Sequence, residues 1–196
     1  MLKICYKHFT WLQTTLLNNL CRVNINNAGF GLGGEFAKTD LTAELEMIQV
    51  NVTALTHLTK LVLPPMVERK RGAILNVAST ASFQPGPLMA VYYATKAYVL
   101  SFSEAIAEEL RDTGVTVTAL CPGPTETGFA SAANMEGSRL FKTGLAQSSD
   151  VARAGYDAMK RGTRVVVPGM RNKLLAQSIR ISPRRVVTAI VRRMNG

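Results

Sequence analysis

A tyrosine, a lysine and a serine between residues 79 and 96 are the residues of this sequence best suited to proton transfer. Tyr92 and Lys96 are four residues apart in a segment with helical spacing of apolar residues, so they share one face of the expected helix. A free tyrosine ionises at about pH 10, and a neighbouring cation favours the phenolate. The pair therefore predicts a Tyr92 pKa lowered towards neutral pH, where the side chain could act as an acid or base.

Ser79 directly follows an apolar run, residues 73–78, that predicts a buried strand. Parallel α/β sheets bind their ligands at the carboxyl ends of the strands, so Ser79 could hold a substrate oxygen beside Tyr92. The alternative explanation of the Tyr-x-x-x-Lys spacing is a half-buried ring next to a solvated amine, which is common on helices.

Ser79, Tyr92 and Lys96 together resemble the active site of the short-chain dehydrogenase/reductase family. Asn26-Asn27-Ala28-Gly29, Asn51 and Pro122-Gly123 fall in the family's order, and the resemblance covers about residues 23–170. It implies an α/β Rossmann-like fold, NAD or NADP as the cofactor, and hydride transfer between the nicotinamide and a carbonyl or alcohol substrate. Nothing in the sequence identifies the substrate or chooses between the two dinucleotides.

The resemblance also implies roles for individual residues. Tyr92 would be the catalytic acid or base, Lys96 would bias it and hold the nicotinamide ribose, Ser79 would fix the substrate oxygen, and Asn51 would hold a water in a proton relay. The implied cofactor contacts are Asn27, Ala28, Gly29, Tyr92, Lys96, Pro122, Gly123 and Thr127. For both glycine-containing segments, a simple turn after a strand is the alternative explanation.

Family members open with a strand, a glycine-rich turn and a helix that bind the pyrophosphate, and this pattern is not found ahead of Val23. The glycines of residues 29–34 do not replace it, because they follow a later strand. We therefore expect a partial doubly wound parallel sheet lacking the N-terminal strands, with the Val23–Ile25 strand at its edge. We also expect weak dinucleotide binding, and a chain that is either a truncated reading frame or a functional short form.

The remaining elements follow from apolar spacing and breakers. An apolar stripe from Leu41 to Val62 predicts one helix, which Pro64 and Pro65 should end or kink. A second helix is expected over residues 88–111, and strands over residues 115–120 and 164–167. The resemblance implies that residues 128–146 lie over the substrate. It also implies a homo-oligomer in which the helices bearing Asn51 and Tyr92 contact a second subunit.

The net charge of +10 arises at the C-terminal end, because residues 160–196 contain ten Lys/Arg and no acidic residue. We divide the chain into an unrelated or poorly defined segment 1–22, a catalytic portion 23–170 and a basic tail 171–196. Pro183 should split the tail into two amphipathic pieces. They could lie on an anionic membrane or a hydrophobic partner, or they could pack on the protein's own sheet. Nucleic-acid binding is not expected, because the tail has no recognition motif.

Three cysteines without metal-ligand spacing indicate reduced thiols, and no apolar run has membrane-spanning length. We therefore expect a cytoplasmic protein, with peripheral membrane attachment as the option that the tail adds. The function expected first is that of an NAD(P)-dependent oxidoreductase. The alternative is a catalytically dead or interaction-only fragment that has lost dinucleotide binding.

Overall fold

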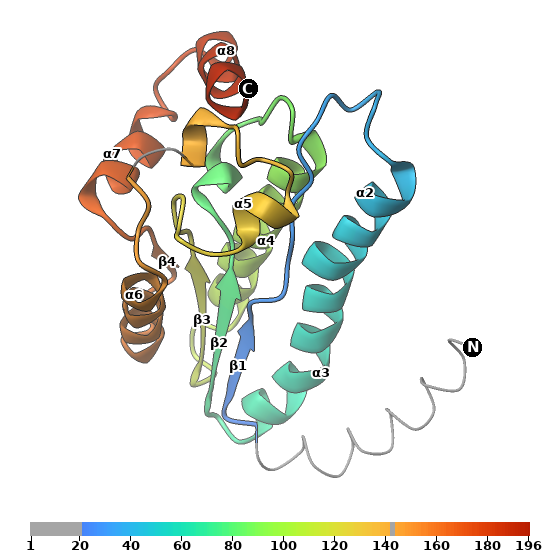
Figure 1. The fold of residues 1–196 in the computed structure, drawn as a ribbon. Coiled ribbons are helices and arrows are strands. Elements are labelled where there is room, and N and C mark those ends of the chain that lie inside the picture. The colour runs from blue at the N-terminus through green and yellow to red at the C-terminus, as the bar shows by residue number, and fades with distance from the viewer. Residues whose placement is uncertain (1–20, 142–143) are drawn as a thin grey trace.

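The computed structural model of the chain describes residues 21–141 and 144–196 (Figure 1). All but the last two residues of the poorly defined segment 1–22 lie outside these ranges. The four strands are β1 (Val23–Asn26), β2 (Gly72–Val77), β3 (Val115–Leu120) and β4 (Val165–Val166). The helices are α2 (Leu41–Ile48), η1 (Gln49–Ala54), α3 (Leu55–Glu68), η2 (Thr80–Phe83), α4 (Ala90–Glu109), α5 (Phe129–Ala132), η3 (Arg139–Phe141), α6 (Ser148–Lys160), α7 (Met170–Ser178) and α8 (Arg184–Asn195).

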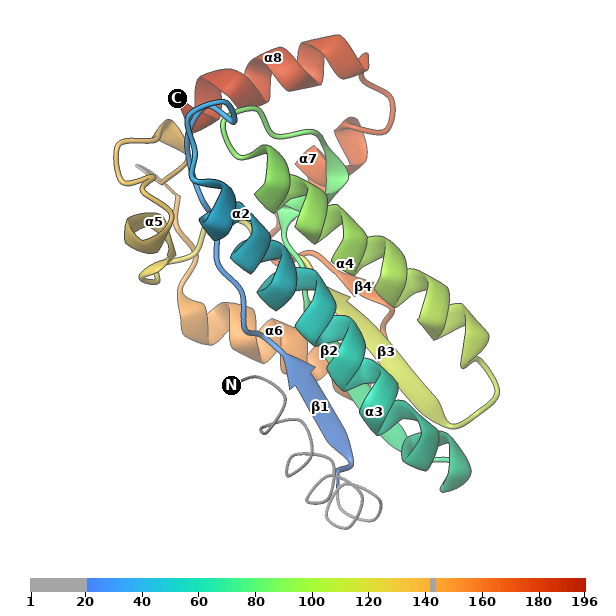
Figure 2. The same ribbon diagram turned by 90° about the vertical axis from the view of Figure 1, so that its right-hand side faces the viewer.

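The strands form one parallel sheet in the order β1-β2-β3-β4, as expected for part of a doubly wound fold. Val23 pairs with Ala73 in β2, and Gly72 pairs with Val115 in β3. The α2–α3 segment and α4 cover one face of the sheet, and α6 covers the other (Figure 2). The predicted α/β layering is confirmed.

Buried side chains alternate between the two faces of the central strand β2. Ile74 packs with Val117 and Met66 beneath α3 and α4, whereas Leu75 packs with Leu120 beneath α6. Successive side chains of a strand point to opposite faces, so a strand that is covered on both sides is mostly apolar on both. This explains the apolar run before Ser79, in which the one polar residue, Asn76, is buried in hydrogen bonds to Asn26 and Ser103.

Strand β1 is an edge within the described residues, as predicted. Val23 and Ile25 are 45% and 53% exposed, while Asn26 is buried on the opposite face. The Asn26 amide donates to Asn76 Oδ1 at 2.8 Å and to Thr59 Oγ1 at 3.1 Å. These hydrogen bonds connect β1 to both β2 and α3, and they account for a polar residue in a short buried strand.

The α2–α3 segment departs from the prediction in two ways. Pro64 and Pro65 do not end the helix, which continues to Glu68. A proline frees the carbonyl four residues before it, and Pro64 frees that of the exposed Lys60, where water can bond to it. The second departure is η1, a π-helical turn that includes Asn51 and separates α2 from α3. Such turns are frequent at functional sites and are not apparent from apolar spacing.

The basic tail forms two helices, α7 and α8, with Pro183 directly before α8 as predicted. The prediction that both are amphipathic is wrong for α7, because its apolar residues are not gathered on one face, and it holds for α8. One face of α8 packs on the protein through Val187 and Val191, although its contacts lie around the start of α4 and not on the sheet. The amide of Asn195 donates to Pro87 O at 2.8 Å. Among the described residues, no helix has both the length and the apolar character needed to cross a membrane.

Candidate active site

Ser79, Tyr92 and Lys96 meet at the carboxyl end of β2, where the sequence placed them. Ser79 follows the strand directly, and Tyr92 and Lys96 lie in the first two turns of α4. The turn at Gly86 packs against the ring of Tyr93 in the first turn of α4. A Cβ at Gly86 would lie 2.1 Å from that ring, so the close approach requires glycine.

The Lys96 side chain is 6% exposed and points into the site. Its Nζ donates to Val77 O at 2.9 Å and lies 5.8 Å from the centre of the Tyr92 ring. Burial disfavours the ammonium form and lowers the pKa of Lys96 to about 8. At neutral pH the group therefore keeps most of its positive charge.

Tyr92 is 9% exposed, and its pKa is raised to about 12. Desolvation is the main cause, and a hydrogen bond with the side chain of Ser79 opposes it. The predicted lowering of this pKa is therefore wrong for the protein without ligands, because burial outweighs the nearby cation. At neutral pH Tyr92 is a protonated phenol beside the Ser79 hydroxyl.

Asn51 joins the loop after β1 to helix α4. Its Oδ1 accepts from Phe30 N at 3.1 Å, while its Nδ2 donates to Phe30 O at 2.9 Å and to Thr95 Oγ1 at 3.1 Å. Thr95 precedes Lys96, so Asn51 is connected to the helix that bears the tyrosine and lysine. The side-chain amide is fully used in these contacts, and its predicted part in a water relay stays a prediction.

The predicted cofactor residues Asn27, Ala28 and Gly29 are exposed at the carboxyl end of β1. A Cβ at Gly29 would lie 2.9 Å from Asn51 Oδ1 and 3.4 Å from Lys96 Nζ. Because Gly29 has no side chain, the backbone can pass close to Asn51 and Lys96 while its outer side stays exposed.

The loop after β3 contributes Pro122 and Gly123 next to Ser79. Thr80 N donates to Pro122 O at 2.8 Å, and this bond connects the ends of β2 and β3. A Cβ at Gly123 would lie 2.5 Å from the amide of Asn172, so this glycine packs against α7. Thr127 is exposed, and its hydroxyl accepts from Phe129 N at 3.3 Å. Within the described residues, the hydrogen bonds of the Thr127 hydroxyl go to Thr125 and Phe129 and not to another predicted site residue.

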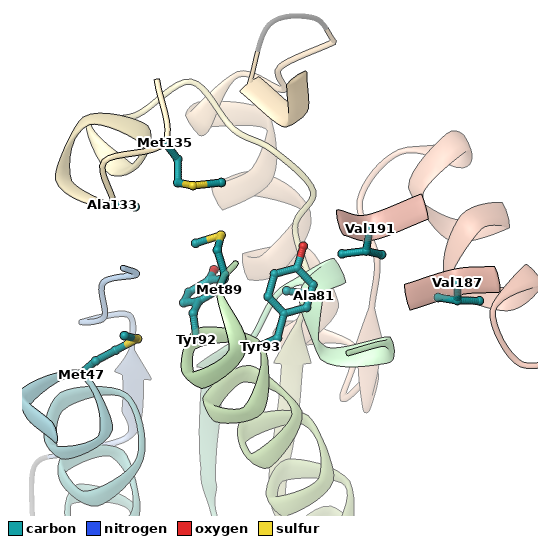
Figure 3. Close-up of a cluster of buried hydrophobic side chains, with 9 residues drawn as sticks. All are labelled: Met47, Ala81, Met89, Tyr92, Tyr93, Ala133, Met135, Val187 and Val191. Carbon is teal, nitrogen blue, oxygen red and sulfur yellow. The ribbon is translucent and has the colours of Figure 1, made fainter. Parts of the chain in front are cut away.

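Apolar side chains from distant segments cover Tyr92. The rings of Phe129 and Tyr92 have centroids 5.2 Å apart, and Met89 and Met135 belong to the same cluster (Figure 3). Residues 129–135 thus lie over the site, as the resemblance implied. Neither Phe129 nor Thr95 was predicted individually as a site residue, because neither has a local pattern that points to the site.

The family model for "short chain dehydrogenase" matches residues 14–137, which is more than half of the chain. The chain belongs to the short chain dehydrogenase family. The chain is 35% identical over 146 residues to the ketoacyl reductase HetN of Nostoc sp., covering 74% of this chain and 50% of that relative. It is 46% identical over 85 residues to the very-long-chain 3-oxoacyl-CoA reductase of Bos taurus, covering 43% of this chain and 27% of that relative.

The chain has the same fold as a solved structure, the short-chain dehydrogenase from Sphingobium yanoikuyae in complex with NADPH. The TM-score is 0.74 at 28% identity, over 87% of this chain and 68% of the other. The chain spans half or less of the length of the two curated relatives above.

Proposed function

We propose that this chain provides the proton-transfer and substrate-positioning half of an NAD(P)-dependent oxidoreductase that interconverts a carbonyl and an alcohol. The observation that supports it most is the convergence of Ser79, Tyr92 and Lys96 at the end of β2. The side chain of Ser79 lowers the pKa of Tyr92 against the effect of burial, and Lys96 Nζ lies 5.8 Å from the centre of the tyrosine ring.

In the reductive direction, the nicotinamide ring would supply a hydride to the carbonyl carbon. Tyr92 would donate its proton to the carbonyl oxygen, and Ser79 would hold that oxygen through a second hydrogen bond. The raised pKa of Tyr92 keeps the phenol protonated at neutral pH, which suits a proton donor. The positive charge of Lys96 would stabilise the phenolate that remains, and Asn51 would hold the Lys96 helix in position and support the return of a proton.

The ribose and nicotinamide end of a dinucleotide fits the residues present. The exposed backbone of Asn27 to Gly29 passes beside Lys96, the Pro122-Gly123 loop lies next to Ser79, and Thr127 is accessible further along that loop. The pyrophosphate fits less well. In the glycine-rich loop after β1, Gly33 N and Gly34 N each donate to a backbone carbonyl at 2.8 Å, and Asp40 caps the following helix. We propose that NAD or NADP binds this chain weakly.

The apolar cover over Tyr92 supports an apolar carbonyl substrate. Met89, Phe129 and Met135 provide sulfur and aromatic surface where a charged substrate would lose its hydration. Several relatives are ketoacyl reductases by name, and we propose a ketone or ketoacyl group as the first substrate class to test.

The test is oxidation of NADH and of NADPH by the purified chain, at saturating dinucleotide, with a panel of aliphatic and aromatic ketones and a 3-ketoacyl thioester. Ketone-dependent turnover is expected for at least one combination of dinucleotide and carbonyl substrate. No turnover with any pair would favour the alternative, an interaction-only fragment.

We also propose a homo-oligomer through α2–α3 and α4. A groove of about 420 Å³ between these helices is lined by Phe36, Ile48, Val52 and Val91, and Leu45 is exposed nearby. Sedimentation should detect a dimer that Leu45→Glu weakens and that Tyr156→Glu, an exposed change on α6, leaves intact. A monomer at all concentrations would contradict this proposal.

Finally, we propose a cytoplasmic location with peripheral membrane attachment through residues 171–196. The free thiols of Cys21 and Cys121 and the charge of the tail support it.

A further inference from the structure

We propose that α8 docks on an anionic membrane through the apolar face that remains uncovered when its neighbouring face packs beside the candidate active site. This inference identifies the surface that would make the peripheral attachment proposed above, and its main test does not depend on catalysis.

The side chains of α8 form two neighbouring apolar rows. Val187 and Val191 are buried in the cluster that includes Tyr92 and Tyr93 (Figure 3). Val186, Ile190 and Met194, at successive intervals of four, form the second row and are 52%, 52% and 38% exposed. Packing within this chain therefore uses only part of the apolar surface of the helix.

Cations flank the exposed row. Arg185 and Arg192 are seven residues apart and share the outer face of α8, and Arg193 lies between them and the apolar row. All three arginines are exposed, and no ion pair within the described residues involves a cation of residues 170–196. An exposed apolar row beside unpaired arginines is the pattern of helices that lie in the interface of an anionic bilayer.

The segment before α8 extends this surface. Ile181, in the turn between α7 and α8, is 88% exposed. Residues 160–196 contain no acidic residue that could repel anionic lipid. An anionic bilayer matches both the charge and the exposed apolar row, and it is the occupant that we infer.

Docking in this orientation would place the candidate site next to the bilayer. Asn195 donates to Pro87 O at 2.8 Å, and Ser138 Oγ donates to Met194 O at 2.7 Å, so α8 contacts both the turn before α4 and the segment that covers Tyr92. An apolar ketone dissolved in the membrane would then be near the site. This consequence rests on the proposed oxidoreductase function, whereas the docking itself does not.

The first experiment is flotation of the full chain with vesicles of phosphatidylcholine alone or with phosphatidylglycerol. Binding is expected only with the anionic lipid. The triple variant Arg185→Gln, Arg192→Gln, Arg193→Gln should bind about 100-fold more weakly, because each charge near anionic lipid contributes about 1 kcal/mol. A control with the same net charge, Lys60→Gln, Arg153→Gln, Arg161→Gln, removes exposed cations from α3, α6 and the end of α6 and should bind like the wild type.

The second experiment locates the apolar row. In a Trp11→Phe background, tryptophan in Ile190→Trp should be quenched by brominated lipid in anionic vesicles, and tryptophan in the control Tyr156→Trp should not. Equal binding to both lipids, no binding, or equal loss in the two triple variants would overturn the proposal. A lipid-free dimer that Ile190→Glu abolishes would show instead that this face contacts a second copy of the chain.

Discussion

The side chain of Asn51 pairs with the backbone of Phe30 as one peptide group pairs with another. Phe30 N donates to Asn51 Oδ1 at 3.1 Å, and Asn51 Nδ2 donates back to Phe30 O at 2.9 Å. Asn51 lies in the π-helical turn η1, and it is 2% exposed. This pairing connects the loop after β1 to the helix layer, directly after the predicted cofactor residues Asn27 to Gly29.

Asn51→Ala should lower the free energy of unfolding by about 2–4 kcal/mol, because it leaves the Phe30 peptide without its partner and removes the bond that the Thr95 hydroxyl accepts. Urea denaturation measures this change. The control Thr53→Ala alters an exposed residue of the same turn and should change stability by less than about 0.5 kcal/mol. Equal stability of the two variants would show that the Asn51 pairing contributes nothing.

Tyr92→Phe should reduce ketone-dependent turnover by about 10²–10⁴-fold with little change in fold, because only the proton-donating hydroxyl is lost. The matched control is Tyr93→Phe, which removes the neighbouring hydroxyl that donates to Asn195 Oδ1 at 3.3 Å. The control should keep its turnover and lose about 1 kcal/mol of stability. Steady-state rates and thermal unfolding of both variants provide the comparison, and near wild-type turnover of Tyr92→Phe would exclude the proposed role.

The stability of the protein should rise with pH above pH 8 because of Lys96. Its pKa is lowered to about 8 from the ordinary 10.5, so above pH 8 the folded chain has released a proton that the unfolded chain still binds. The free energy of unfolding then increases with pH, by at most about 1.4 kcal/mol per pH unit for one group.

Denaturation of the wild type and of Lys96→Met at several pH values from 7.0 to about 9.5 isolates this contribution. The wild type should gain up to about 2 kcal/mol relative to the variant between pH 8 and 9.5. The range stops below the ordinary tyrosine pKa of 10.0, because the raised pKa of Tyr92 has the opposite effect at higher pH. Burial also raises the pKa of Cys121 from 9.0 to about 12, which opposes Lys96 within the range, but this effect is common to both proteins and cancels in the comparison. Parallel stability curves for the two proteins would contradict the lowered pKa.

The 196-residue chain alone should bind NAD and NADP with millimolar or weaker affinity. In family members a glycine-rich turn donates several charge-assisted hydrogen bonds to the pyrophosphate, each worth about 1.5–3 kcal/mol. A dinucleotide that lacks these bonds is bound more weakly by orders of magnitude. Gly33 N and Gly34 N do not compensate, since both donate to carbonyl groups of the protein. Calorimetry with each dinucleotide tests this expectation, and a low micromolar dissociation constant would refute it.

Local patterns in the sequence were sufficient to predict the setting of the site. The apolar run before Ser79 and the four-residue spacing of Tyr92 and Lys96 predicted three polar groups beside the end of one strand, and the structure brings them together there. Strand alternation and helical periodicity are properties of short segments, so the sequence of each segment is enough to indicate them. The uneven charge and the break at Pro183 likewise predicted two basic helices at the C-terminal end.

Tertiary structure decided the properties that depend on distant neighbours. The pKa of Tyr92 is raised and not lowered, because Phe129 and Met135 arrive from a segment more than thirty residues away and exclude water. Of two adjacent asparagines, Asn26 is buried in hydrogen bonds to Asn76 and Thr59, while Asn27 remains open. Burial and partner choice are set by packing between segments, which no pattern within one segment encodes.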